Sequence, residues 1–263
     1  MLSASDQNLL RQRLERDLAS RLRVDVFTQK PSPIIIPGRQ ECAYCEEVET
    51  LMKEVASLSP RIALSLHDIE AERALAAGLG VDKAPATVLR GAANRPLRFF
   101  GLPSGPQFPN LVEIMVDAAR GKVALLPDTV TQLRKLKTDV RLQVFVTTTC
   151  PHSPLMVRTA ARFALQSVRI KLDIIEIEEY PVLFQQYGIP AVPATLIGEK
   201  WLLPGVMDEQ TLAQQVLRFA EGRPLDKDLQ PGAFTPLDPN MFRPKGSQPS
   251  QPATSTGGII LPR

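Results

Sequence analysis

The sequence Cys42-Ala43-Tyr44-Cys45, taken with Ala84-Pro85-Ala86-Thr87 further along the chain, decides the fold because both stretches have a second copy. In that copy, Cys150-Pro151-His152-Ser153 is followed by Val192-Pro193-Ala194-Thr195. The first cysteine and the proline are 43 positions apart in both copies (85 − 42 and 193 − 150). Identical spacing in two copies indicates an internal repeat. The second copy ends in serine, so it lacks the thiol that would complete a pair of cysteines.

The repeat divides the 263 residues into two units of about one hundred residues, each large enough to bury its own core. We assign residues 1–122 to the first unit, which has Cys-x-x-Cys, and residues 123–223 to the second, which has a single cysteine. Residues 224–263 are rich in proline, glycine and serine and have almost no periodic apolar pattern. They are expected to form a disordered tail.

Composition argues against several classes of protein. A net charge of +3 is too small to indicate a nucleic-acid partner. No apolar run approaches the roughly 18 residues needed to cross a bilayer, so no membrane partner is expected. Residues 1–23 are too charged for a secretory signal, which predicts a cytoplasmic protein. In that reducing compartment, three cysteines indicate redox or metal chemistry rather than a disulfide scaffold.

Hydrophobic periodicity predicts the same succession of elements in both units. In the first unit we expect helices at 5–22, 41–58, 70–79 and 110–119, and strands at 24–28, 61–69, 87–90 and 97–100. In the second we expect helices at 154–165, 181–187 and 209–221, and strands at 142–146, 169–177, 195–197 and 200–203. Phe27 precedes Cys42 by 15 positions, whereas Phe145 precedes Cys150 by 5. The first unit therefore has a ten-residue insertion beside its cysteines, which is either a ligand-contacting loop or an ordinary surface loop.

The cysteines are the candidate reactive groups. The helix predicted at 41–58 places Cys42 at a helix N-terminus, where free N–H groups and the helix dipole favour a thiolate. Cys45 follows one turn later, within disulfide reach of Cys42. The alternative is half of a zinc site, but a tetrahedral site needs four ligands and the chain offers only the three cysteines with His67 and His152. We therefore predict redox chemistry, with no metal and no cofactor.

Pro85 and Pro193 are predicted to follow cis peptide bonds. A proline that recurs at the same distance from a cysteine is better explained by a cis bond than by two ordinary trans prolines at the start of a strand. A cis bond would turn the backbone of Ala84 or Val192 toward the cysteines, where it could pair with a substrate peptide. Tyr44 and His152 are further candidates for substrate contact, although Tyr44 could equally pack on the helix end. His67 is interpreted as a core or edge residue and Trp201 as a core residue.

The order of strand, Cys-x-x-Cys helix, strand, helix, proline-led hairpin and helix resembles the thioredoxin fold. Two fused copies are similar to the glutaredoxin-like protein disulfide oxidoreductases of thermophilic archaea and bacteria. The resemblance covers about residues 5–222 and is carried by residues 84–87, 99–105 and 144–151. It implies an α/β protein with two tandem thioredoxin-like units, each a central mixed sheet flanked by helices. Members usually have a complete Cys-x-x-Cys in each unit, so Ser153 departs from the pattern.

The resemblance also implies an activity. It implies an enzyme that exchanges disulfides with protein disulfide or dithiol substrates, with Cys42 attacking as a thiolate and Cys45 resolving the mixed disulfide. A thioredoxin-reductase-like flavoenzyme would recycle the pair. The second unit would act with Cys150 alone.

Two other functions remain open from the residues. The chain could be a thiol-dependent client-binding or redox-sensing protein that uses Cys150. A weaker alternative is iron–sulfur binding with glutathione, as in monothiol glutaredoxins, but Cys-Pro-His-Ser differs from their usual Cys-Gly-Phe-Ser.

Overall fold

The computed structural model describes residues 2–32 and 41–226. Most of the insertion expected beside the first cysteine pair, and residues 227–263 of the tail expected at 224–263, lie outside these described residues.

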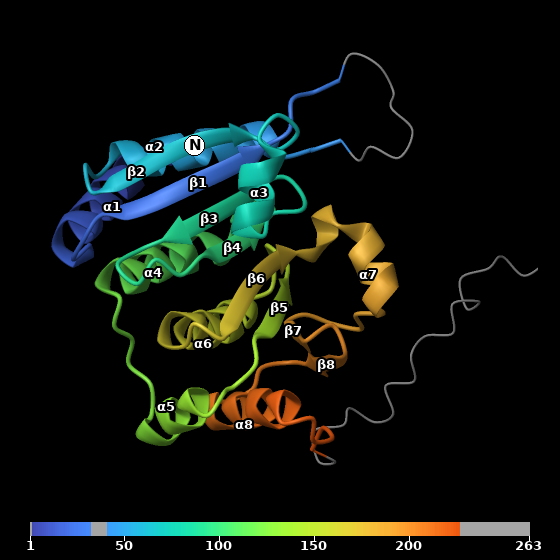
Figure 1. Cartoon of the computed structure of the whole chain (residues 1–263). Helices are drawn as coiled ribbons and strands as arrows, with labels where there is room; N and C mark the ends of the chain where they lie inside the picture. The colour runs from blue at the N-terminus through green and yellow to red at the C-terminus, as the bar shows by residue number, and fades with distance from the viewer. Residues whose placement is uncertain (1, 33–40, 227–263) are drawn as a thin grey trace, which may run out of the picture.

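Each unit follows the predicted order of elements (Figure 1). The first contains α1 (Ala4–Asp17), β1 (Leu22–Thr28), α2 (Cys45–Ser57), β2 (Ile62–Asp68), α3 (Arg73–Leu79), β3 (Ala86–Arg90), β4 (Leu97–Phe100) and α4 (Gln107–Arg120). The second contains α5 (Pro127–Arg134), β5 (Val140–Val146), α6 (Ser153–Gln166), β6 (Ile170–Glu176), the short 3-10 helix η1 (Ile177–Glu179), α7 (Pro181–Tyr187), β7 (Ala194–Ile197), β8 (Trp201–Pro204) and α8 (Glu209–Ala220).

The sheets of the two units are joined into one. Strands β2-β1-β3-β4 of the first unit continue into β6-β5-β7-β8 of the second, because β4 pairs in parallel with β6. The α/β fold with two tandem thioredoxin-like units is confirmed. The sequence analysis did not predict that the sheets of the two units would join through β4 and β6. All four residues of β4 are buried, which is the pattern of an interior strand rather than of a free edge.

Helices cover both faces of this sheet. One apolar cluster includes residues of α1, α2, α4, α5, α6 and α8, while a second includes residues of α3, η1 and the segments beside α7. Both clusters contain residues from both units, so the two units share their hydrophobic core. This packing fixes the two cysteine sites relative to one another.

Buried charges are paired at the β4–β6 edge, which forms the seam between the units. Asp173 on β6 is fully buried, and its carboxylate accepts a hydrogen bond from Nε of Arg98 on β4. Its other oxygen lies 2.6 Å from Nε of Arg141 on β5. A buried charge is costly unless it is paired, so this contact couples the pairing of β4 with β6 to the charge balance of the core.

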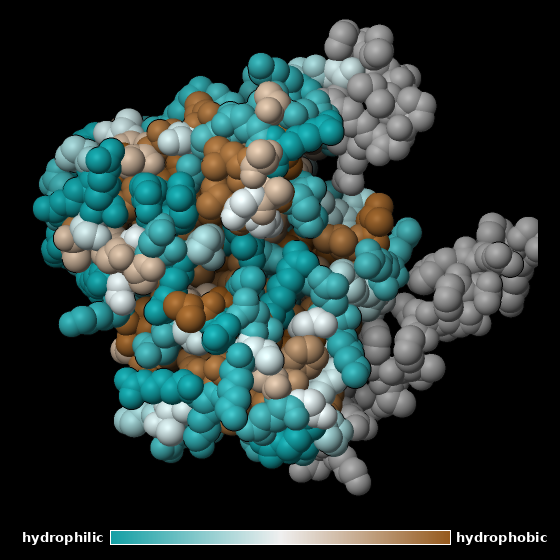
Figure 2. All heavy atoms as spheres, viewed as in Figure 1, coloured by the Kyte–Doolittle hydropathy of each residue, from teal (hydrophilic) through white to brown (hydrophobic). Residues whose placement is uncertain are grey.

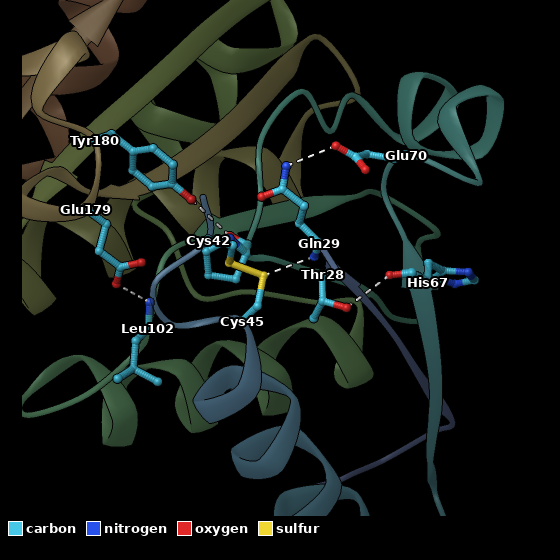
Figure 3. Close-up of a disulfide and its surroundings, with 10 residues drawn as sticks. Thr28, Gln29, Cys42, Cys45, His67, Glu70, Leu102, Glu179 and Tyr180 are labelled. Atoms are coloured by element: carbon cyan, nitrogen blue, oxygen red, sulfur yellow. Dashed lines mark hydrogen bonds between the residues drawn. A yellow bond between two sulfur atoms is a disulfide. The ribbon is translucent and has the colours of Figure 1, made fainter. Parts of the chain in front are cut away.

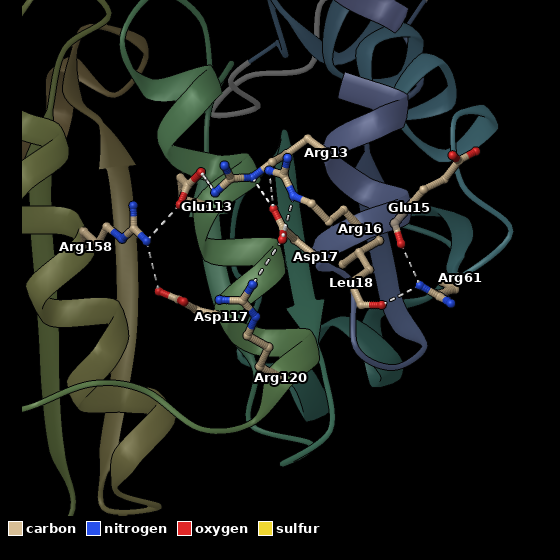
Figure 4. A network of polar contacts seen from close by, with 10 residues as sticks. All are labelled: Arg13, Glu15, Arg16, Asp17, Leu18, Arg61, Glu113, Asp117, Arg120 and Arg158. Carbon is tan, nitrogen blue, oxygen red and sulfur yellow. Dashed lines mark hydrogen bonds and ion pairs between the residues drawn. The ribbon is translucent and has the colours of Figure 1, made fainter. Parts of the chain in front are cut away.

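A second set of ion pairs links the helices of the two units (Figure 4). Glu113 on α4 lies 2.9 Å from Nη2 of Arg158 on α6 and 2.6 Å from Nη2 of Arg13 on α1. These side chains are partly exposed, so each pair adds little by itself. Together they hold α1, α4 and α6 in one orientation.

The structure differs from the sequence prediction at two helices away from the cysteines. The helix expected at 5–22 ends at Asp17, and Leu22 begins β1 by donating its N–H to the carbonyl of Arg61. Leu22 joins the same core cluster as Leu14, so the apolar pattern continues through a change from helix to strand. Helix α5 is absent from the sequence prediction, although Pro127 occupies its first turn and Leu133 reaches the core.

Candidate dithiol active site

Cys42 and Cys45 form a disulfide, with their Cα atoms 5.6 Å apart. Cys45 is the first residue of α2 and is 7% exposed, whereas Cys42 is half-buried in the preceding turn. The expectation that the helix includes Cys42 is therefore wrong by one turn, because Tyr44 has a non-helical backbone and serves as the N-cap. The more exposed sulfur is the one that a substrate can reach, and the buried sulfur is shielded behind it.

The backbone of the first unit surrounds this pair (Figure 3). The N–H of Gln29, just after β1, donates to Sγ of Cys45 over 3.1 Å. The side chain of Gln29 donates to Glu70, which holds the loop in place. The predicted cis bonds are confirmed at Ala84–Pro85 and Val192–Pro193.

Two residues of the second unit lie beside the cysteine pair of the first unit (Figure 3). The sequence did not predict this contact between the units. Tyr180, which follows η1, donates its hydroxyl to the carbonyl of Pro85 over 3.1 Å in a buried contact. Glu179 accepts the N–H of Leu102 over 2.6 Å. Burial, assisted by the carboxylates of Glu176 and Glu47, raises the pKa of Glu179 to about 7 against the opposing effect of the Leu102 hydrogen bond.

Cys150 is placed like the first unit's cysteines but has no sulfur partner. It is a half-buried free thiol whose Sγ lies 3.6 Å from the carbonyl oxygen of Val192, the residue before the cis proline. Helix α6 begins at Ser153, with exposed His152 as its N-cap. Burial opposes the thiolate, but the neighbouring Ser153 side chain and the N–H groups of His152 and Ser153 outweigh it and lower the pKa of Cys150.

Tyr44, His67 and Trp201, which the sequence analysis also singled out, differ in exposure and in the residues they contact. Tyr44 is 42% exposed beside the first pair. His67 lies on edge strand β2, where its ring nitrogens contact Asp25 and Glu72 and its ring stacks on Phe27. This agrees with its interpretation as an edge residue. Trp201 packs edge-on against Phe219 at the margin of the core and is only partly buried.

Across residues 2–32 and 41–226, no group of three or more histidine, cysteine, aspartate or glutamate side chains is placed to hold a metal ion. No helix within the same ranges is long and apolar enough to span a membrane.

Comparison with known proteins agrees with this geometry. The thioredoxin domain family matches residues 140–217, which lie in the second unit. A probable thioredoxin from Archaeoglobus fulgidus is 27% identical over 84 residues, which are 32% of this chain and 92% of that protein. A crystal structure of a protein disulfide oxidoreductase from Aeropyrum pernix is 26% identical, with a TM-score of 0.75, and the match covers 85% of this chain and 95% of that one. The chain is a thioredoxin-fold disulfide oxidoreductase.

Another similar structure supports the two-unit fold of this oxidoreductase. The alkylhydroperoxide reductase AhpF of Enterococcus faecalis matches with a TM-score of 0.72 and 22% identity, covering 82% of this chain and 99% of that one. At this identity the similarity concerns the fold alone.

The two sites of the oxidoreductase should differ in thiol acidity. Glu46 and Glu47 occupy the first turn of α2 and disfavour a thiolate nearby, while the first turn of α6 has no acid. We expect the pKa of Cys150 to be lower than that of Cys42 in the reduced protein. Thiolate absorbance against pH, on variants that each retain one of the two cysteines, measures both values. A higher pKa for Cys150 would contradict this expectation.

Proposed function

We propose that this oxidoreductase exchanges disulfides with protein substrates through Cys42 and Cys45. The Cys42 thiolate attacks a substrate disulfide, forms a mixed disulfide and releases one substrate sulfur as a thiolate. The Cys45 thiolate then attacks the Cys42 sulfur and releases the second substrate sulfur, which leaves the Cys42–Cys45 disulfide. Two electrons pass to the substrate in each cycle, and a dithiol donor must return them.

The observation that supports this proposal most directly is the arrangement of the pair itself. Cys42 is accessible, and Cys45 is 7% exposed at the start of α2. The hydroxyl of Tyr180, which donates to the carbonyl of Pro85 in the cis Ala84–Pro85 segment, lies beside the pair (Figure 3). We assign the backbone of Ala84 and the exposed ring of Tyr44 to substrate contact. Reduction of insulin by the chain with dithiothreitol as donor tests the proposal, and activity that persists in Cys42→Ser would overturn it.

The same proposal assigns a role to each part of the chain. Residues 1–122 form the dithiol unit, residues 123–223 the monothiol unit, and residues 224–263 a tail. We further propose that the protein works in the cytoplasm, where a thioredoxin-reductase-like flavoenzyme returns electrons to the Cys42–Cys45 pair.

A second function is supported by the single thiol of the other unit. Cys150 has a lowered pKa, and Ser153 stands where a resolving sulfur would be. A mixed disulfide on Cys150 cannot be resolved within this unit, so it would persist until an external thiol attacks it. We propose capture of clients on Cys150, with Val192 and His152 as the neighbouring contacts. Client capture that survives loss of Cys42 and Cys45 and disappears in Cys150→Ser would support this function.

Ser153→Cys should give the second unit a working dithiol. Position 153 begins α6 as position 45 begins α2, and each unit has its cis proline. Residue 153 is fully buried, so the new sulfur would be shielded as Cys45 is. We expect oxidised glutathione to produce a 150–153 disulfide, detected by mass spectrometry of the digested protein. If position 153 stays reduced under conditions that oxidise Cys42 and Cys45, the geometry of the second site is unsuited to a dithiol.

A further inference from the structure

The two cysteine sites each have a hollow beside the residue that precedes the cis proline. One hollow, of about 430 Å³, includes Gln29 and Ala84 in its lining and therefore lies next to Cys45, which Gln29 contacts. The other, of about 440 Å³, includes Thr147 and Val192 and therefore lies next to Cys150, whose sulfur is 3.6 Å from the Val192 carbonyl. Both are open to solvent and run toward the equivalent short helices, α3 and α7.

The two hollows are built from matched positions of the repeat. Beyond the cysteines, corresponding residues are 108 positions apart (192 − 84), and the hollows share this offset at 69 and 177, 70 and 178, 73 and 181, 76 and 184, 81 and 189, 83 and 191, and 84 and 192. The hollows are therefore the same feature of the fold, and any difference between them reflects the side chains.

Several of the matched positions differ in charge and size. In the first unit the lining includes Arg73, Asp82 and Lys83. In the second unit, Pro181 replaces Arg73, and Ala191 replaces Lys83. The buried Ala76 of the first hollow becomes Phe184, which is 48% exposed at the second. Glu178 is the charged side chain in the second lining, and its counterpart Glu70 is present in the first.

Exposed apolar side chains are also present on α6, which begins three residues after Cys150, and on α7, which contributes to the lining of its hollow. Helix α7 has no buried residue, and its Val182 is 63% exposed. Leu155, in the first turn of α6, is 62% exposed. Figure 2 shows apolar residues at the position that α7 occupies in Figure 1. Apolar side chains that line a hollow beside a reactive thiol mark a candidate binding surface.

We infer that the hollow lined by Phe184, Ile189, Ala191 and Val192 selects the substrates of Cys150. Its occupant is an extended polypeptide with a large apolar side chain next to the cysteine that reacts. The reactive thiol identifies the occupant as a chain with a disulfide, and the backbone of Val192 is placed to align it. This inference rests on the proposed reactivity of Cys150, and it assigns the two units different substrates: charged or polar neighbours at the first site and apolar neighbours at the second.

Oxidised full-length protein allows a direct test, because Cys150 is then the one free thiol among its three cysteines. The probes are two peptides, acetyl-Gly-Xaa-Cys-Xaa-Gly-amide, with phenylalanine or serine as Xaa and the cysteine joined to thionitrobenzoate by a disulfide. Attack by the Cys150 thiolate forms a bond to the peptide sulfur and releases the coloured thionitrobenzoate anion, so sulfur and electrons balance. Mass spectrometry verifies the adduct on Cys150.

We expect the phenylalanine peptide to react about tenfold faster than the serine peptide, a ratio that partial burial of one aromatic side chain can supply. Phe184→Ser should bring the ratio close to one by slowing the phenylalanine peptide. Val182→Ser is the matched control, since it removes another exposed apolar side chain of α7 that is not part of the lining. It should preserve the ratio. A variant that only altered the acidity of Cys150 would slow both peptides equally.

Equal rates for the two peptides, or a ratio that survives Phe184→Ser, would overturn the pocket assignment and leave the proposed capture function intact. Failure of Cys150 to react with either peptide would overturn both. Turnover by Cys42 and Cys45 is measured separately on insulin, so its success or failure is distinguishable from either result.

Discussion

Replacement of Cys45 by serine is expected to stop catalytic turnover and to trap protein substrates on Cys42 as mixed disulfides. The attacking sulfur would remain, but no second sulfur would lie within the 5.6 Å Cα separation that Cys45 provides. Initial capture should proceed, and insulin reduction should fall to the background rate of the donor thiol. Non-reducing electrophoresis would detect the trapped complex, and dithiothreitol should release it.

The matched control for this experiment is Cys150→Ser. It removes the single thiol of the second unit and leaves the first pair intact, so most of the insulin reduction should remain. Equal losses from Cys45→Ser and Cys150→Ser would mean that the two units act in series, which would contradict the division of roles proposed for them.

Asp173→Asn is expected to cause the largest loss of stability of any single polar substitution proposed for this protein. The change keeps the shape of a fully buried side chain but leaves Arg98, itself nearly buried, without its counter-charge. Removal of one partner from a buried pair typically costs about 3–5 kcal/mol in the free energy of unfolding. For a folded region of this size, the melting temperature should fall by roughly 10 °C. Urea unfolding followed by circular dichroism measures the free energy.

Asp139→Asn provides the comparison for Asp173→Asn. Asp139 also pairs with two basic side chains, Arg169 and Lys171, but at the surface. Hydrogen bonds from Lys171 and Arg169 lower the pKa of Asp139, and solvent screens the pairs. The midpoint of unfolding should hardly move. If the two variants lost equal stability, the buried charge between the units would contribute no more to stability than a surface ion pair does.

Much of the fold could be predicted from the sequence because local patterns determine it. The strands and helices around each cysteine, and the two cis prolines, follow from apolar periodicity and from the repeat itself. The end of α1 was misjudged because Leu22 faces the same core from a strand as Leu14 does from a helix. Apolar spacing indicates which residues are buried and does not always reveal the backbone that buries them.

The contacts between the units could not be predicted in this way. Pairing of β4 with β6 depends on two edges meeting, and alternation along a strand is the same whether its edge is free or paired. The hydrogen bond from Tyr180 to Pro85 joins residues 95 positions apart. The sequence showed only an acidic segment after a strand, and nothing in it indicated that Glu179 and Tyr180 would lie beside the first unit's site.

The reduction potential of the Cys42–Cys45 pair tests the central claim most directly. Full-length protein is equilibrated with glutathione buffers of graded ratio, free thiols are alkylated after acid quenching, and mass spectrometry counts them. A catalytic pair should change from dithiol to disulfide between about −270 and −120 mV, the range of thioredoxin-fold oxidoreductases. A pair that remains oxidised below about −300 mV would be a structural disulfide. That result would contradict the assignment of Cys42 and Cys45 as the redox centre.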